Sequence, residues 1–287
     1  MGYKGFRIVA AFLALLPMAG AGTVNAPPRA AAVVPVASTT TLVAPDGRQV
    51  EVTIVAPASP RGVILYSHGA GSSPAVTQAH FDRWAERGFA VLAPTHTDSR
   101  NIPAERRTSL QAALATRVAD MKLAASHANK SWSDLPIAQV GYSYGSLIAL
   151  IGGGAMSGLI PGTIPAVNAI VMFSSPGPIA PLTSMTGAFT AVTAPTLLVT
   201  GTADTVPGFV PDPESHLVYF SGLPEGGRTA LVVKNATHAF IRGDQPGWSE
   251  VSPIVEDFLA SRVLGDGAAG QRFDAAKSTE MVEVRRR

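Results

Sequence analysis

A serine stands between two glycines in the segment Gly141-Tyr142-Ser143-Tyr144-Gly145. This segment has the form G-x-S-x-G, follows an apolar run at 137–140 and precedes good helix formers at 146–150. Between a strand and a helix, such a serine lies on a tight, strained turn, where flanking side chains would collide with neighbouring backbone. The start of the following helix also favours developing negative charge. We therefore predict that Ser143 is a nucleophile.

A serine hydroxyl needs a base to take its proton and an acid to orient that base. In this type of fold the acid and then the histidine follow the serine along the chain. Asp204 comes just after the apolar run at 196–200, and His238 comes just after the run at 229–233. Because parallel strands end at one edge of a sheet, we predict that Ser143, Asp204 and His238 converge as a catalytic triad.

Other acids and histidines are placed less well for these roles. Asp212 and Glu214 lie in a proline-rich loop farther from a strand end. His216 is expected to open a helix, and His127 is expected to lie inside a long helix.

Acyl transfer also requires donors for the oxyanion of the tetrahedral intermediate. The backbone N–H of Tyr144, directly after the nucleophile, is one predicted donor. The loop Ser67-His68-Gly69-Ala70-Gly71 follows an apolar strand and is similar to the H-G-x-G loop of esterases. We predict Ala70 as the second donor, with Gly71 as the alternative, and expect His68 to brace the loop.

Three aromatic or histidine side chains are candidates for the substrate pocket. Tyr142 and Phe240 flank the predicted triad in sequence and serve either as pocket walls or as ordinary packing. His96 and Asp98 follow a strand end and are expected to border the cleft. As a metal pair they lack partners, so no metal and no cofactor are predicted.

Short apolar runs alternate with helical patterns along most of the chain, which predicts a mostly parallel, doubly wound α/β sheet. The expected single domain spans 42–264 and has no large cap, because only residues 174–195 separate two of its strands. That open site favours soluble or extended esters. The predicted strands lie at 50–55, 63–66, 89–93, 137–140, 169–173, 196–200 and 229–233, and the predicted helices at 78–87, 104–129, 146–151 and 251–263.

The two ends of the chain have a different composition. Lys4 and Arg7, an apolar run at 8–16 and small residues up to 26 predict a signal peptide at 1–26, and hence a secreted or periplasmic protein. Residues 27–41 are expected to form a linker, and 265–287 a disordered tail. The net charge of +2 favours neither nucleic acid nor an anionic membrane, and zero cysteines exclude disulfides and a cysteine nucleophile. After signal removal no membrane insertion is expected.

The segments 66–71, 88–94, 141–145, 201–204 and 237–240 together resemble the dienelactone hydrolase and platelet-activating-factor acetylhydrolase branch of α/β-hydrolases. The resemblance spans about residues 48–262 and implies the α/β-hydrolase fold. Dienelactone hydrolases use cysteine as nucleophile, whereas this chain has Ser143. Bacterial cutinase-like members usually carry a disulfide, which a chain without cysteine lacks. The resemblance thus implies a serine esterase that cleaves carboxylic esters through an acyl-enzyme. The alternatives are a serine peptidase or amidase, and an inactive hydrolase fold that serves as a binding protein.

Overall fold

One nine-stranded sheet organises the part of the chain that the computed structural model describes, residues 1–2 and 35–287. Its order is β1-β2-β4-β3-β5-β6-β7-β8-β9. The strands from β3 to β8 are parallel to one another, while β1, β2 and β9 run antiparallel to their neighbours. The strands are β1 (Val36–Val43), β2 (Gln49–Ala56), β3 (Gly62–Ser67), β4 (Phe89–Pro94), β5 (Ile137–Tyr142), β6 (Val167–Phe173), β7 (Thr196–Gly201), β8 (Arg228–Val233) and β9 (Val282–Arg286).

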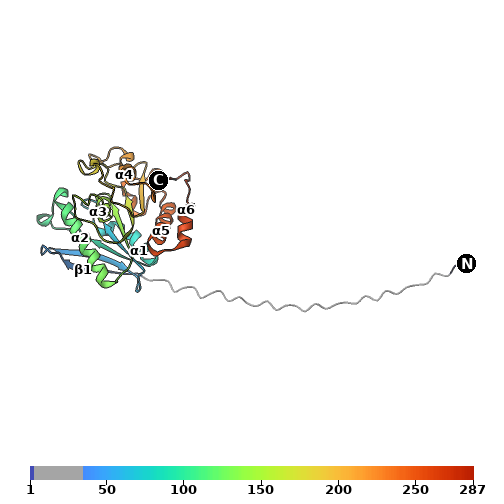
Figure 1. The fold of residues 1–287 in the computed structure, drawn as a ribbon, viewed down its shortest axis with the longest axis horizontal. Helices are drawn as coiled ribbons and strands as arrows, with labels where there is room; N and C mark the ends of the chain where they lie inside the picture. The colour runs from blue at the N-terminus through green and yellow to red at the C-terminus, as the bar shows by residue number, and fades with distance from the viewer. Residues whose placement is uncertain (3–34) are drawn as a thin grey trace. The chain divides into compact units, whose positions relative to one another are not determined.

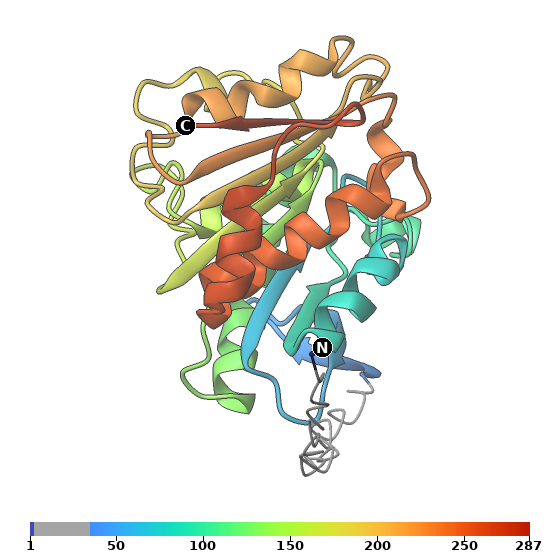
Figure 2. The same cartoon turned by 90° about the vertical axis from the view of Figure 1, so that its right-hand side faces the viewer.

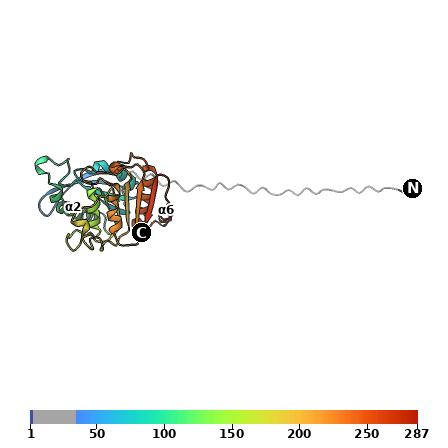
Figure 3. The same ribbon diagram turned by 90° about the horizontal axis from the view of Figure 1, so that it is seen from above.

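Helices cover both faces of this sheet. Helices α1 (Gln78–Glu86), α5 (Trp248–Leu264) and α6 (Gly267–Ala275) contribute to one buried apolar cluster, and α2 (Leu110–Ser131), α3 (Tyr144–Gly152) and α4 (Val218–Gly222) to another. Figures 1 and 3 show α2 and α6 on opposite sides of the sheet. Residues on both faces of the central strands are therefore buried, which explains why those strands read as continuous apolar runs.

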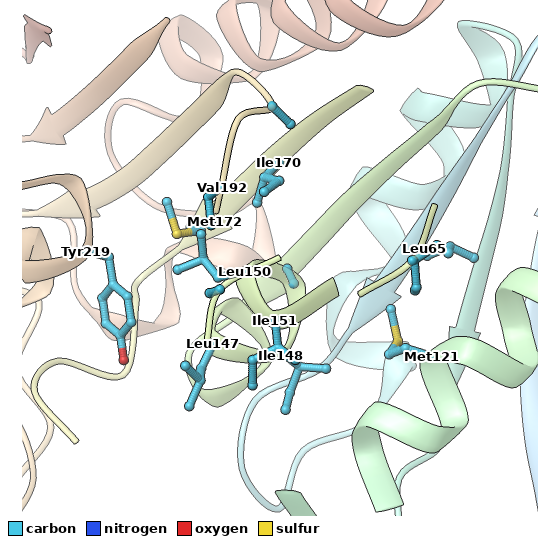
Figure 4. Close-up of a cluster of buried hydrophobic side chains, with 14 of the residues drawn as sticks. Leu65, Met121, Leu147, Ile148, Leu150, Ile151, Ile170, Met172, Val192 and Tyr219 are labelled. Carbon is cyan, nitrogen blue, oxygen red and sulfur yellow. The ribbon is translucent and has the colours of Figure 1, made fainter. Parts of the chain in front are cut away.

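The second cluster packs α2 and α3 against the middle of the sheet. Leu147, Ile148 and Ile151 of α3 belong to the same cluster as Ile170 of β6, and Met121 of α2 lies near Leu65 of β3 (Figure 4). All these side chains are buried. The helix that follows Ser143 is thus anchored along its length, and this fixes the turn from which it starts.

The structure confirms the predicted doubly wound sheet without a large cap. All seven predicted strands are present, and the four predicted helices correspond to α1, α2, α3 and α5. Between β6 and β7 the chain is described throughout and forms loops and a short 3-10 turn (Leu182–Ser184), with no α-helix.

The tail expected to be disordered is folded instead. Residues 267–275 form α6, whose Phe273 packs on Phe258 of α5 at 5.1 Å between ring centroids. Figure 2 shows β9, in dark red, alongside β8 at one edge of the sheet. Val282 is 1% exposed, and Arg286 donates hydrogen bonds to the carbonyl groups of Phe273 and Ala276. Two arginines of the terminal triplet, Arg285 and Arg286, thus belong to a strand.

The domain also begins earlier than predicted. Strand β1 starts at Val36, inside the expected linker at 27–41, and pairs with β2 along its whole length. Its side chains are mostly exposed, so backbone hydrogen bonds rather than an apolar run hold it. Residues 3–34, which hold nearly all of the predicted signal peptide at 1–26, lie outside the described part. Among described residues, no helix is both long and apolar enough to cross a membrane.

Candidate functional site

Ser143 occupies the sharp turn between β5 and α3. Its backbone has φ 52° and ψ −122°, a conformation that costs energy for a residue with a side chain. The turn is held because the Ser143 N–H donates to the carbonyl of Phe173 at 2.9 Å. A Cβ at Gly141 would overlap the backbone of Gly145, and one at Gly145 would overlap the carbonyl of Ser67. Both glycines are therefore required by the close approach of backbone, as the sequence pattern predicted.

The three residues predicted as a triad lie in a hydrogen-bonded series. Nε2 of His238 is 3.0 Å from Oγ of Ser143, and Nδ1 of His238 is 2.7 Å from Oδ1 of Asp204. Asp204 follows β7 and His238 follows β8, so both come from the same sheet edge as Ser143. Asp204 is fully buried, while the His238 side chain is 21% exposed. In this arrangement the imidazole can take the serine proton while the carboxylate holds its opposite nitrogen.

Asp204 has two further partners that the sequence did not reveal. The Thr200 hydroxyl donates to Oδ2 at 2.8 Å, and Nε2 of His216 lies 2.9 Å from Oδ1. Burial alone would raise the pKa of Asp204, but the hydrogen bonds and charges of His216 and His238 outweigh it and hold that pKa below its usual range. The carboxylate therefore stays ionised.

His216, which was expected to open a helix, lies in a 3-10 turn (Pro213–Leu217) directly before α4 and is fully buried. Its Nε2 faces the carboxylate and backbone carbonyl of Asp204, and its Nδ1 faces the carbonyl of Ser175. All three partners only accept hydrogen bonds, so both ring nitrogens must carry protons. Burial would lower the pKa of His216, but the hydrogen bond and charge of Asp204 raise it, in agreement with an imidazolium.

The same three side chains, Asp204, His216 and His238, carry ligand atoms that could gather around a metal ion. The two nitrogen–oxygen distances, 2.7 and 2.9 Å, are those of hydrogen bonds. A tetrahedral ion with bonds of about 2.1 Å would hold its ligand atoms about 3.4 Å apart. The observed nitrogen–oxygen distances thus fit hydrogen bonds between these side chains better than they fit ligands of a metal ion.

The loop expected to supply an oxyanion donor passes beside Ser143. A Cβ built on Gly69 would lie 3.3 Å from Cβ of Ser143. The N–H of Gly71 donates to Oδ2 of Asp98 at 2.9 Å, so this alternative donor is already engaged. Within residues 35–287 the N–H of Ala70 meets no protein acceptor. The N–H of Tyr144, at the first position of α3, lacks an intrahelical acceptor. These two amides are available to an oxyanion.

Of the expected pocket residues, Tyr142 alone lies at the site. Its hydroxyl donates to the carbonyl of His238 at 2.9 Å, and its ring centroid is 5.2 Å from that of His238. Phe240 is instead 1% exposed and packs against Trp248 in the core. His96 is fully buried between Ser67 and Asp120, to which its ring nitrogens are hydrogen-bonded. His96 was expected on the cleft because it follows a strand end, but its ring turns inward; for Phe240, the structure places the ring in ordinary packing, the second of its two expected roles.

A buried ion pair lies beneath the oxyanion loop and was not predicted. Nε and Nη2 of Arg117 donate to the two carboxylate oxygens of Asp98, each at 2.8 Å. Arg117 lies on the inner face of α2 with Ala113 and Ala124, and all three are 0% exposed. Their spacing along one helical stripe is the signal in the sequence that could have identified Arg117 as a buried charge.

Comparison with known proteins agrees with the fold. No family model matches the chain, and no curated protein sequence matches it. Among solved structures, the chain is similar to a dienelactone hydrolase from Anabaena variabilis, with a TM-score of 0.63 and 19% sequence identity. The match covers 80% of this chain and 99% of that protein. The chain therefore has the α/β-hydrolase fold that the sequence predicted.

Proposed function

We propose that this protein is a serine hydrolase that cleaves carboxylic esters. The observation that carries the proposal is the hydrogen-bonded series from Ser143 through His238 to Asp204, beside two amides without protein acceptors. In this mechanism His238 takes the proton as Ser143 attacks the ester carbonyl. The amides of Ala70 and Tyr144 bind the oxyanion, and Asp204 stabilises the imidazolium. His238 gives this proton to the departing alcohol as the ester bond breaks and leaves an acyl-enzyme on Ser143. Water activated by His238 then releases the acyl group as a carboxylic acid and restores the serine hydroxyl.

An open site supports soluble or extended esters rather than long buried lipids as substrates. The loops between β6 and β7 hold no α-helix that could close over Ser143. Tyr142 contributes an aromatic wall next to His238. An amide substrate would use the same residues, so a peptidase or amidase is the second candidate.

The test is hydrolysis of p-nitrophenyl esters of increasing acyl length, compared with aminoacyl p-nitroanilides. We expect the short esters to be cleaved at least 100-fold faster than the anilides, and Ser143→Ala to abolish the activity. Preferred cleavage of the anilides would favour the peptidase. Absence of cleavage in both series would favour a binding protein.

A further inference from the structure

Arg117 makes more contacts with the oxyanion loop than a structural ion pair needs. Beyond its bidentate pair with Asp98, Nη1 donates to the carbonyl of His68 and Nη2 donates to the carbonyl of Gly69 at 3.0 Å. Burial would raise the pKa of Asp98, but Arg117 outweighs this and lowers that pKa to about 2. The carboxylate is therefore charged at neutral pH and holds the guanidinium in place.

The carbonyl of Gly69 is held by a second donor as well. The N–H of His96 donates to Nε2 of His68 at 3.0 Å, so the ring proton of a neutral His68 lies on Nδ1. Burial and the nearby charge of Arg117 lower the pKa of His68 well below its usual value, in agreement with a neutral ring. Nδ1 then donates to the Gly69 carbonyl at 2.7 Å.

Holding the Gly69 carbonyl determines where the N–H of Ala70 points, because both belong to one peptide group. In a planar trans peptide the C=O and N–H bonds point in opposite directions. With the oxygen bound from beneath by Arg117 and His68, the Ala70 N–H faces away from them. Donors on the carbonyl also polarise the peptide and strengthen its N–H as a donor.

Arg117 also contacts the side chain of Tyr144, the residue that carries the other predicted donor. The carbon of its guanidinium lies 5.1 Å from the ring centroid of Tyr144, within the range of a cation–π contact. One buried side chain thus contacts the carbonyl of the peptide group that carries the Ala70 N–H and also the ring of Tyr144.

We propose that Arg117 is a positioning residue of the oxyanion hole, which orients the Ala70 amide through the Gly69 carbonyl and supports Tyr144. This inference rests on the proposed hydrolase function. It assigns Arg117 a role in stabilising the transition state, in addition to its role in folding.

The test compares an ester with its thionoester, in which sulfur replaces the carbonyl oxygen. Sulfur accepts hydrogen bonds more weakly, so the ratio of kcat/KM for the two substrates reports the oxyanion hole and does not depend on the fraction of folded enzyme. We expect Arg117→Lys, which loses the fork that holds both carbonyls, to lower kcat on the ester at least tenfold with KM within threefold. The ester-to-thionoester ratio should fall at least fivefold.

Arg228→Lys is the matched control. Arg228 is also a buried arginine that donates to backbone carbonyls, those of Val192, Ala194 and Pro224, but it has no contact with Ser143 or the loop. We expect the ester-to-thionoester ratio of Arg228→Lys to equal that of the wild type. If Arg117→Lys is not recovered folded, Asp98→Asn loosens the same guanidinium and should lower the ratio in the same direction. An unchanged ratio in both variants would overturn the inference, whereas an inactive wild type would overturn the proposed function instead.

Discussion

Asp204 is bound by two histidines, and they differ in role. His238 contacts the serine, whereas His216 is fully buried and lies between acceptors only. Their rings are stacked with centroids 5.7 Å apart. We infer that His216 fixes the carboxylate that orients the base, without contacting substrate.

At this scale the first prediction concerns His216→Gln. A glutamine cannot donate to both the carboxylate of Asp204 and the carbonyl of Ser175 in the geometry of the ring. We expect about 2 kcal/mol less stability, as is typical for a lost hydrogen bond to a charged group, and a kcat/KM about tenfold lower. Urea unfolding and ester hydrolysis measure the two effects. His127→Gln, on α2 and without such contacts, is the control; equal behaviour of the two variants would contradict this account.

The site residues that the sequence identified correctly are those that directly follow the end of a strand. Ser143, Asp204 and His238 could be placed because each follows an apolar run, and parallel strands bring such positions to one edge. His216 and Arg117 could not be placed in this way, because their partners depend on how loops and helices pack. For the same reason His96 was placed wrongly, and the two roles open to Phe240 could not be separated: sequence position gives the element but not the direction of the side chain.

The central strands of the sheet were predictable, and its edges were not. Strands β3 to β8 are buried on both faces, so each is a run of apolar residues. Strand β1 is rich in threonine and mostly exposed, and β9 consists of alternating valine and charged residues. Alternation over only five residues is a weak signal, and the polar composition of the tail obscured it.

The element scale gives a prediction for β9. Val282 is 1% exposed and pairs with Val233, the last residue of the strand that leads to His238. We expect Val282→Ala to lower the free energy of unfolding by about 2 kcal/mol, through lost apolar burial and the cavity left behind. Glu283→Ala, on the exposed side of the same strand, should change it by less than about 0.5 kcal/mol. Thermal unfolding of the two variants measures both effects. If the tail were disordered, neither substitution would change the stability.

For the whole molecule, a buried carboxylate makes the free energy of unfolding depend on pH. The pKa of Asp98 is about 2 in the folded protein, below its value of about 3.9 in an unfolded chain. Its contribution is therefore fully present above about pH 4 and is lost as the pH falls toward 2. This difference between the folded and unfolded pKa values corresponds to a contribution of about 2 kcal/mol to the free energy of unfolding.

Urea unfolding at pH 7, 4 and 2.5 measures that loss. We expect Asp98→Asn to be less stable than the wild type at pH 7, with the difference narrowing at pH 2.5, where the wild-type carboxyl also begins to bind a proton. A difference that stays constant across these pH values would show that the charge of Asp98 contributes nothing to stability.

The central claim is that His238 and Asp204 activate Ser143 as a nucleophile, and labelling with a fluorophosphonate tests it most directly. Intact-mass and peptide analysis should find one adduct per chain, on Ser143. Labelling should be absent in Ser143→Ala and at least 100-fold slower in His238→Ala, which keeps the hydroxyl but removes the base. An unlabelled wild-type chain, an adduct on another residue, or labelling at the wild-type rate in His238→Ala would contradict the account.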